Sequence, residues 1–210
     1  VAASHTSFRI DRDDAFLSKI KTGLGLVKRI VFLAGLHAGL FLIFIMAKVY
    51  MLPAVPLWNT ASTPRQFFLT TFILGSLTAA VVFAWIKERI PATKSKKTGV
   101  PLSIRPLIQI ALIVSGFTLI ISVLYWTGLN NSLSVSNRSF IDQLSPLIIF
   151  RIILIFLGGL LLTISLRVKG RPDKPEKFRF GVLIISFLVI LFSELVGRFL
   201  FFTLHKIGPM

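Results

Sequence analysis

Apolar residues in this 210-residue chain gather in five long runs that polar stretches separate. The runs cover residues 30–51, 66–86, 107–126, 146–168 and 180–204. Each is close to the roughly 20 residues that a helix needs to cross the hydrocarbon core of a bilayer. None alternates apolar and polar positions with the period of two that barrel strands show, so helices are the way to satisfy the backbone in lipid. The pattern predicts an all-α, polytopic transmembrane bundle with five spans.

The residues before the first run are polar and mixed in charge. Phe16, Leu17, Ile20 and Leu24 nevertheless fall on one helical face, with lysines close to it. Such a face is typical of a helix that lies in the membrane interface. We therefore expect residues 1–29 to form a polar or interfacial segment.

Lysine and arginine are concentrated in every second connection. Six basic residues precede the first span, and the loops after the second and fourth spans hold six each, whereas the two other loops hold little besides Arg65 and Arg138. Because cytoplasmic loops carry the excess of basic residues, this alternation predicts a cytoplasmic N-terminus and a C-terminus outside. Tyr50 and Trp58 then lie at the outer interface, where aromatic residues are enriched. The expected parts are a cytoplasmic segment over residues 1–29, a bundle over residues 30–204 and a short outer tail over residues 205–210.

The composition narrows the classes of function. Hydrophobic residues make up 54% of the chain, which indicates an integral membrane protein. The formal charge of +16 lies in short loops between apolar runs, so it indicates membrane topology and not a nucleic-acid partner. The chain has no cysteine, which excludes a thiolate-ligated iron–sulfur cluster on it. His37 is near the inner end of the first span and His205 at the outer end of the last, so these two cannot bind one haem, and we expect no metal site.

Besides Arg167 at the end of its run, three charged residues lie inside the last two apolar runs. Glu194 and Arg198 share a helical face of the fifth run with Phe201 and His205. With about 1.5 Å of rise per residue, Glu194 lies roughly 21 Å from the cytoplasmic end of its span. Arg151, in the fourth span that descends from outside, reaches nearly the same depth. We therefore expect Arg151 and Glu194 to pair between antiparallel neighbours, with Arg198 as a third member or extending outward.

Two interpretations of this buried charge cluster remain open from the residues alone. The cluster of Arg151, Glu194 and Arg198 is either a structural ion pair that fastens two helices or a site that binds a proton or a ligand. No Gly-rich phosphate loop, nucleophile elbow or metalloprotease helix occurs, so the sequence offers no self-contained hydrolytic or transferase site.

Small residues inside the spans are expected where two helices approach closely. They occur in three pairs, Gly35 with Gly39, Gly75 with Ala79, and Gly158 with Gly159. Glycine and alanine let helix backbones pack at short distance in a membrane.

Two stretches of the chain resemble a known family. Residues 48–60 carry a basic residue followed by Val-Tyr and then a Trp-Asn pair, and residues 63–70 carry a Thr-Pro-x-x-Phe-Phe run. The last span reads Glu-Leu-Val-Gly-Arg-Phe-Leu-Phe from Glu194 and closes with His205. Together with Arg151, these residues resemble the membrane-anchor subunit of the dimethyl sulfoxide reductase family. The resemblance runs from about Lys28 onward and covers what look like the last five of the family's eight spans.

The resemblance implies a role in anaerobic respiration in the bacterial cytoplasmic (inner) membrane. Anchors of this family oxidise menaquinol from the quinone pool and pass its electrons to an iron–sulfur subunit and a molybdopterin catalytic subunit. The clusters and the molybdenum then belong to those partners, and this chain carries no haem, iron–sulfur cluster or molybdenum of its own. In the family, residues implicated in quinol oxidation lie mostly on earlier helices, which have no counterpart here. Within this chain, the resemblance points to Arg151, Glu194 and Arg198, with Tyr50, Trp58 and His205 as contributors at the outer interface.

Two other functions fit the same pattern of spans. One is a small transporter or channel bundle in which the buried arginines and glutamate bind a solute. Transporters tend to have spans broken by Gly or Pro and an inverted repeat. Few spans of this chain are broken in that way, and it shows no convincing inverted repeat. The other is a redox-inert membrane scaffold. Whether the chain is a quinol-oxidising or a non-catalytic subunit is open at this point.

Overall fold

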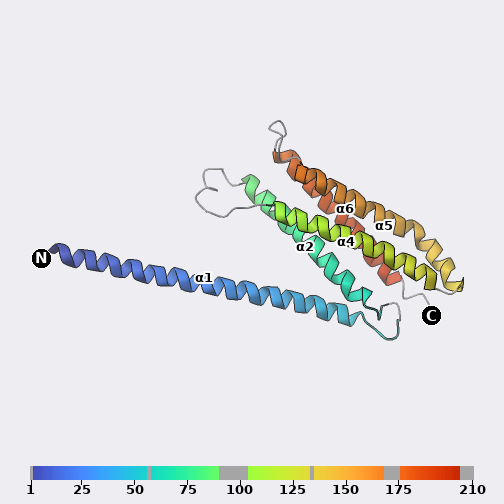
Figure 1. The fold of residues 1–210 in the computed structure, drawn as a ribbon, viewed down its shortest axis with the longest axis horizontal. Coiled ribbons are helices and arrows are strands. Elements are labelled where there is room, and N and C mark those ends of the chain that lie inside the picture. The colour runs from blue at the N-terminus through green and yellow to red at the C-terminus, as the bar shows by residue number, and fades with distance from the viewer. Residues whose placement is uncertain (1, 56–57, 90–103, 133–134, 168–175, 204–210) are drawn as a thin grey trace. The chain divides into compact units, whose positions relative to one another are not determined.

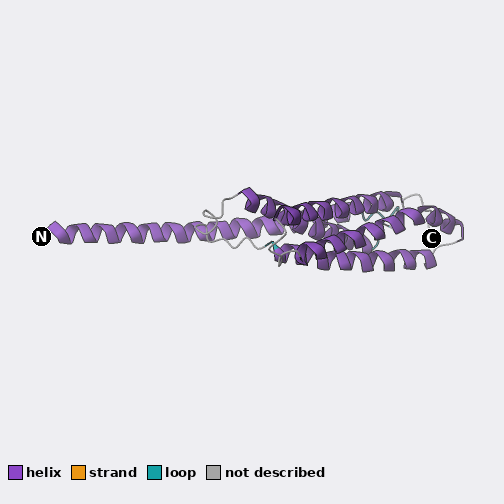
Figure 2. Ribbon diagram, turned by 90° about the horizontal axis from the view of Figure 1, so that it is seen from above, coloured by secondary structure: helices purple, strands orange, loops and turns teal. Residues whose placement is uncertain are grey.

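The computed structural model describes residues 2–55, 58–89, 104–132, 135–167 and 176–203, and the side chains of residues 25–55, 58–87, 104–128, 140–167 and 178–203. Five helices make up nearly all of these residues, and no strand occurs among them (Figures 1 and 2). They are α1 (Ala2–Val49), α2 (Ser62–Arg89), α4 (Arg105–Ser132), α5 (Val135–Arg167) and α6 (Glu176–Thr203). The expected tail, His205 included, and the side chains of the expected interfacial face before residue 25 lie outside the described residues.

All five helices are long and apolar enough to cross a membrane. The segments that meet this condition are Gly25–Val49, Ser62–Lys87, Arg105–Gly128, Phe140–Arg167 and Phe178–Thr203. The prediction of an all-α protein with five spans is therefore confirmed. Which end of each span faces the cytoplasm stays a prediction.

The chain divides into two units, residues 1–46 and residues 47–210. The second unit is a bundle of α2, α4, α5 and α6. Helix α2 packs against α4 and α6, and α5 packs against the same two helices, so the four helices close a ring. This arrangement gives the bundle one common interior.

Two apolar clusters fill this interior at different levels. The first lies toward the Thr203 end of α6 and consists of Trp126, Ile141, Leu144, Ile148 and Leu200. The second lies toward the opposite end and includes Ile73, Leu77, Ile108, Leu162, Leu183 and Ile190. On each of α4, α5 and α6, buried polar or charged residues lie between these two levels. The bundle therefore has a polar layer between two apolar ones.

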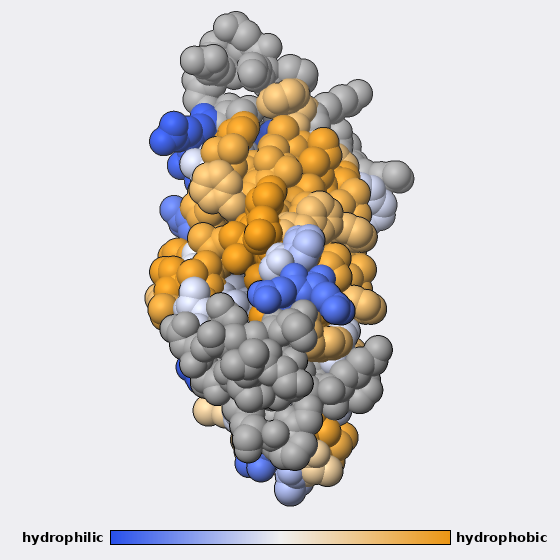
Figure 3. Space-filling view, turned by 90° about the vertical axis from the view of Figure 1, so that its right-hand side faces the viewer, coloured by the Kyte–Doolittle hydropathy of each residue, from blue (hydrophilic) through white to orange (hydrophobic). Residues whose placement is uncertain are grey.

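The surface of the bundle is apolar, as lipid contact requires. Phe117, Phe156 and Leu195 are among many large apolar side chains that are more than half exposed. Figure 3 shows apolar side chains over most of the described surface on one face. In water such a surface would cost free energy, whereas lipid tails solvate it.

Helices α5 and α6 are the most closely packed neighbours of the bundle, and a glycine makes this possible. A Cβ atom at Gly158 would overlap the Ile190 side chain of α6, so only glycine leaves room there. Gly159 has ordinary contact distances to α4, with Ser115 Oγ 3.7 Å from its would-be Cβ. The prediction of close packing is confirmed at Gly158 and is wrong at Gly75, where nothing lies within 4 Å.

Candidate functional site

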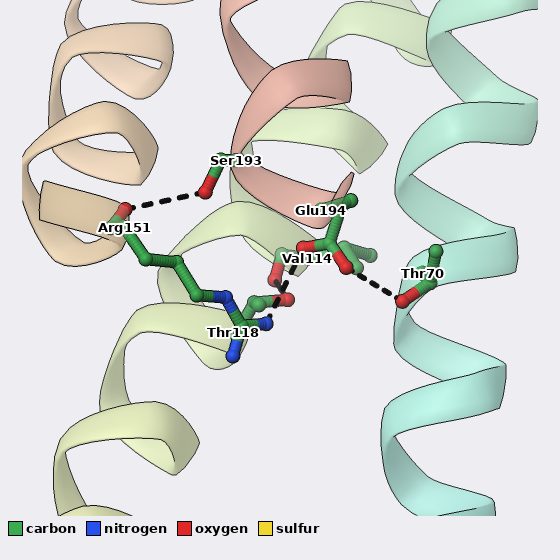
Figure 4. Close-up of polar contacts among 6 residues, drawn as sticks. All are labelled: Thr70, Val114, Thr118, Arg151, Ser193 and Glu194. Atoms are coloured by element: carbon green, nitrogen blue, oxygen red, sulfur yellow. Dashed lines mark hydrogen bonds and ion pairs between the residues drawn. The ribbon is translucent and has the colours of Figure 1, made fainter. Parts of the chain in front are cut away.

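The polar layer is centred on Arg151 of α5 and Glu194 of α6. Arg151 Nη2 lies 3.7 Å from Glu194 Oε1, and the two residues are only 6% and 4% exposed (Figure 4). The structure thus brings together two residues that lie on different spans and that the sequence placed at one depth. At 3.7 Å the groups form an ion pair without a direct hydrogen bond, since such bonds are about 2.7 to 3.2 Å long.

Two further side chains fix the pair. Thr70 of α2 donates a hydrogen bond of 2.7 Å from its hydroxyl to Glu194 Oε2. Ser193, next to Glu194, donates one of 3.2 Å from its hydroxyl to the Arg151 carbonyl oxygen (Figure 4). The glutamate is therefore tied to α2 and α5 at once, which holds three helices in register at this level.

Gly197 makes the space that the Arg151 guanidinium occupies. A Cβ atom built on Gly197 would lie 2.5 Å from Arg151 Cζ, 2.6 Å from Nε and 2.8 Å from Nη2. Such distances are far below van der Waals contact. Gly197 follows Glu194 by three positions, so both lie on the face of α6 that receives the arginine.

A small cavity adjoins the pair between α2, α4, α5 and α6. Its volume is about 10 Å³, which is close to the minimum for one water molecule. Besides Arg151 and Glu194, its polar lining consists of Gln66, Thr70, Thr118, Ser122 and Tyr125. The cavity has no room for an aromatic ring or an organic solute.

Arg198 takes a different partner from the one that its sequence position suggested. Its guanidinium lies over the ring of Phe67, with Cζ 3.9 Å from the ring centroid. This is a cation–π contact, which stabilises a cation that is partly removed from water. Between the described Arg198 and Glu194 side chains the structure contains no ion pair. Arg198 therefore connects the polar layer with aromatic residues of the neighbouring helix.

Five aromatic rings form a cluster at the Thr203 end of α6. The aromatic cluster consists of Tyr50, Trp58, Phe67, Phe201 and Phe202. Trp58 and Phe201 stack with their centroids 5.3 Å apart, and the Trp58 indole N–H donates a 2.9 Å hydrogen bond to the Phe201 carbonyl oxygen. The Thr63 hydroxyl in turn donates to the Trp58 carbonyl oxygen at 2.6 Å. The loop before α2 is thereby fastened to the end of α6.

Replacing Trp58 with phenylalanine tests this fastening. The variant keeps a ring in the cluster but removes the donor to Phe201, so we expect the free energy of unfolding to fall by about 1 kcal/mol. Unfolding in mixed detergent micelles, followed by circular dichroism, measures this. Equal stability of variant and wild type would show that the indole hydrogen bond contributes nothing.

Comparison with known proteins places the chain. The family described as "DMSO reductase anchor subunit (DmsC)" matches residues 15–204. The chain belongs to this family. The prediction from residues 48–60, 63–70 and the last span is therefore confirmed.

Three curated relatives, each named as one chain of an anaerobic dimethyl sulfoxide reductase, have modest identity to this anchor-family protein. One, from Escherichia coli (strain K12), is 28% identical over 175 residues, which cover 80% of this protein and 53% of the relative. Its namesake from Haemophilus influenzae is 29% identical over 192 residues, with 91% and 60% covered. The third, YnfH of Escherichia coli (strain K12), is 25% identical over 191 residues, with 91% and 61% covered. The protein thus spans a little over half the length of these relatives, and no solved structure matches it.

The remaining candidate residues are dispersed or lie outside the described part of this anchor. Tyr50 and Trp58 lie together in the aromatic cluster. His37 donates from Nδ1 to the Leu33 carbonyl oxygen of its own helix at 2.8 Å, and His205 is not described. Among the described residues, no three histidine, aspartate or glutamate side chains gather as a metal site would require.

Sequence reasoning missed most of the polar layer. Thr70, Gly197, Thr118, Ser122 and Tyr125 contact the pair or line the cavity, yet each is unremarkable alone in an apolar helix. A usable signal was present in their spacing. Polar residues repeat every three or four positions along α2 and α4, which places them on one face of each helix.

Proposed function

We propose that this chain provides five spans of a membrane anchor that oxidises menaquinol and passes the electrons to an iron–sulfur subunit, which serves a molybdopterin catalytic subunit. The family match over residues 15–204 is the observation that carries the proposal. The curated relatives are named as chains of anaerobic dimethyl sulfoxide reductases, which supports the same assignment. The proposed location is the bacterial cytoplasmic membrane, with the N-terminus inside and the C-terminus outside.

The polar layer supports a part in the proton chemistry of this reaction. Oxidation of a quinol releases protons, and a buried carboxylate is a suitable acceptor when it is within reach. We assign this part to Glu194, with Arg151 as its ion-pair partner and Arg198 one turn away on the same helix. Because the adjoining cavity accommodates about one water molecule, the quinol ring itself binds outside it, and its protons reach Glu194 through intervening water.

The aromatic cluster supports a place for Tyr50 and Trp58 at the outer interface. Their rings lie with Phe201 at the end of α6, next to the Arg198–Phe67 contact. Aromatic residues are enriched at membrane interfaces, and a quinol reaches its site from the membrane. We propose that this cluster borders the quinol site on the outer side.

The small size of the cavity also argues against the alternative function, a transporter. A solute site in the bundle would need a pocket around the charge cluster, whereas the described residues leave room for about one water molecule there. A redox-inert scaffold differs from an active anchor in ligand binding and not in shape.

Two measurements on the full chain test the proposal. Copurification of molybdenum and iron–sulfur absorbance with the affinity-purified chain is expected for an anchor, and its absence from an intact membrane extract would contradict the assignment. Fluorescence titration with a hydroxyquinoline N-oxide, a menaquinol-site inhibitor, is expected to show saturable binding that Arg198→Gln weakens. Absence of binding by a folded, partner-associated chain would leave the anchor role and refute quinol oxidation by these spans.

A further inference from the structure

A row of polar side chains runs along the contact between α2 and α4. On α2 they are Ser62, Gln66 and Thr70, and on α4 they are Thr118, Ser122 and Tyr125. The first three are spaced by four residues and the others by four and three, so each set occupies one helical face. We call these six residues the α2–α4 seam. At one end of the seam, Thr70 is hydrogen-bonded to Glu194. At the other end, Ser62 is the first residue of α2.

Three of the six seam residues are buried in the bundle, and Gln66, Thr70 and Tyr125 are partly buried. Ser62, Thr118 and Ser122 are 8%, 4% and 6% exposed. Five of the six residues line the cavity beside Glu194, and the sixth, Ser62, interacts with the Tyr125 side chain. The Ser62 hydroxyl is also hydrogen-bonded to the Thr60 hydroxyl at 2.6 Å, in the loop before α2. Polar side chains therefore line the way from the cavity beside the buried carboxylate to the loop end of the bundle.

The inner end of the seam has unused hydrogen-bonding capacity. Neither Arg151 Nε nor Glu194 Oε1 has a hydrogen-bond partner, although both atoms are fully buried and their residues line the cavity. Buried polar atoms without partners are costly, and a polar cavity of this size is where a bound water molecule satisfies them. A water there would accept from Arg151 Nε and donate to Glu194 Oε1. It would also bring Glu194 within reach of the hydroxyl groups of α4.

We propose that the α2–α4 seam, with one water molecule in its cavity, is a proton path from Glu194 to the loop end of the bundle. This inference rests on the proposed function. When a quinol is oxidised, its two O–H bonds break, two electrons leave to the iron–sulfur partner, and the ring becomes a quinone. Each released proton forms an O–H bond on the Glu194 carboxylate, passes to the cavity water, and leaves through Tyr125 and Ser62. Glu194 returns to its ionised form after each transfer.

The groups around Glu194 come from all four helices of the bundle. Arg151 faces it from α5 and Arg198 lies one turn away on α6, while α4 presents the Tyr125 hydroxyl and α2 presents Gln66 and Thr70, neither of which is charged. The exchangeable protons that adjoin Glu194 on the α2–α4 side therefore belong to hydroxyl and amide groups of the seam.

Variants of the seam that leave the ion pair in place test the proposal. In the complete complex in vesicles, we expect Tyr125→Phe and Ser122→Ala to slow proton release on quinol oxidation by about tenfold and to raise the solvent deuterium isotope effect. The matched control is Ser115→Ala, which removes a buried hydroxyl of α4 that does not line the cavity. Inhibitor affinity is expected to be unchanged in all three.

The outcomes separate the two proposals. If the wild-type complex oxidises a menaquinol analogue but both seam variants release protons as fast as Ser115→Ala, the proton path is refuted and the anchor function stands. If dithionite reduces the iron–sulfur clusters of the wild-type complex but the menaquinol analogue does not, the proposed function is refuted. The proton path is then refuted with it. Slowed proton release with intact inhibitor binding supports both.

Discussion

Replacing Arg151 with leucine is expected to lower the free energy of unfolding by about 3–5 kcal/mol. The substitution leaves the Glu194 carboxylate buried without its cation, in a site where only Thr70 donates to it. The reciprocal change, Glu194→Leu, strands the Arg151 guanidinium and is expected to cost a similar amount. Reversible unfolding in mixed detergent micelles measures both.

The double variant shows whether the two residues act as a pair. Because Arg151→Leu with Glu194→Leu removes both charges, it leaves no isolated ion, and we expect it to be more stable than either single variant. The coupling free energy from the four proteins measures the interaction. Additive losses would mean that the 3.7 Å approach contributes nothing to stability.

Gly197→Ala is expected to lower the free energy of unfolding by about 1–3 kcal/mol. The added methyl group would lie 2.5 Å from Arg151 Cζ and 2.6 Å from Nε, so the guanidinium would have to move away. The matched control is Gly181→Ala on the same helix, where nothing lies within 4 Å of the new atom. Alanine is the better helix former, so the control is expected to gain up to about 1 kcal/mol.

A second background isolates the cause of the Gly197 effect. Leucine at position 151 is too short to reach the space beside Gly197, so Gly197→Ala should cost far less in the Arg151→Leu protein than in the wild type. An equal cost in both backgrounds would place the strain outside the Arg151–Gly197 contact.

The depth of the charged residues was predictable because position along a transmembrane helix is proportional to the number of residues. Rise per residue is constant, so counting from the ends of the fourth and fifth runs was enough to put Arg151 beside Glu194. The contact partner of Arg198 was not predictable in this way. Its side chain is long and flexible, and both Glu194 one turn back and the Phe67 ring on α2 were within its reach.

The aromatic cluster shows the same limit for the loop before α2. The aromatic positions marked an interface, but stacking of Trp58 on Phe201 depends on how the loop turns back onto α6. Loop direction follows from several weak contacts made together, and no single residue determines it. The family resemblance identified the same stretch without giving its geometry.

The sequence by itself determined the five spans, the membrane as solvent and the level of the charge cluster, because hydropathy and helical rise act locally along the chain. The tertiary structure alone decided which helices meet, and so which side chains complete the site. Thr70 reaches Glu194, Gly197 admits Arg151, and the polar residues of α2 face those of α4 only because the four helices close a ring. These contacts depend on the rotation of each helix about its axis, which the packing of all four together sets.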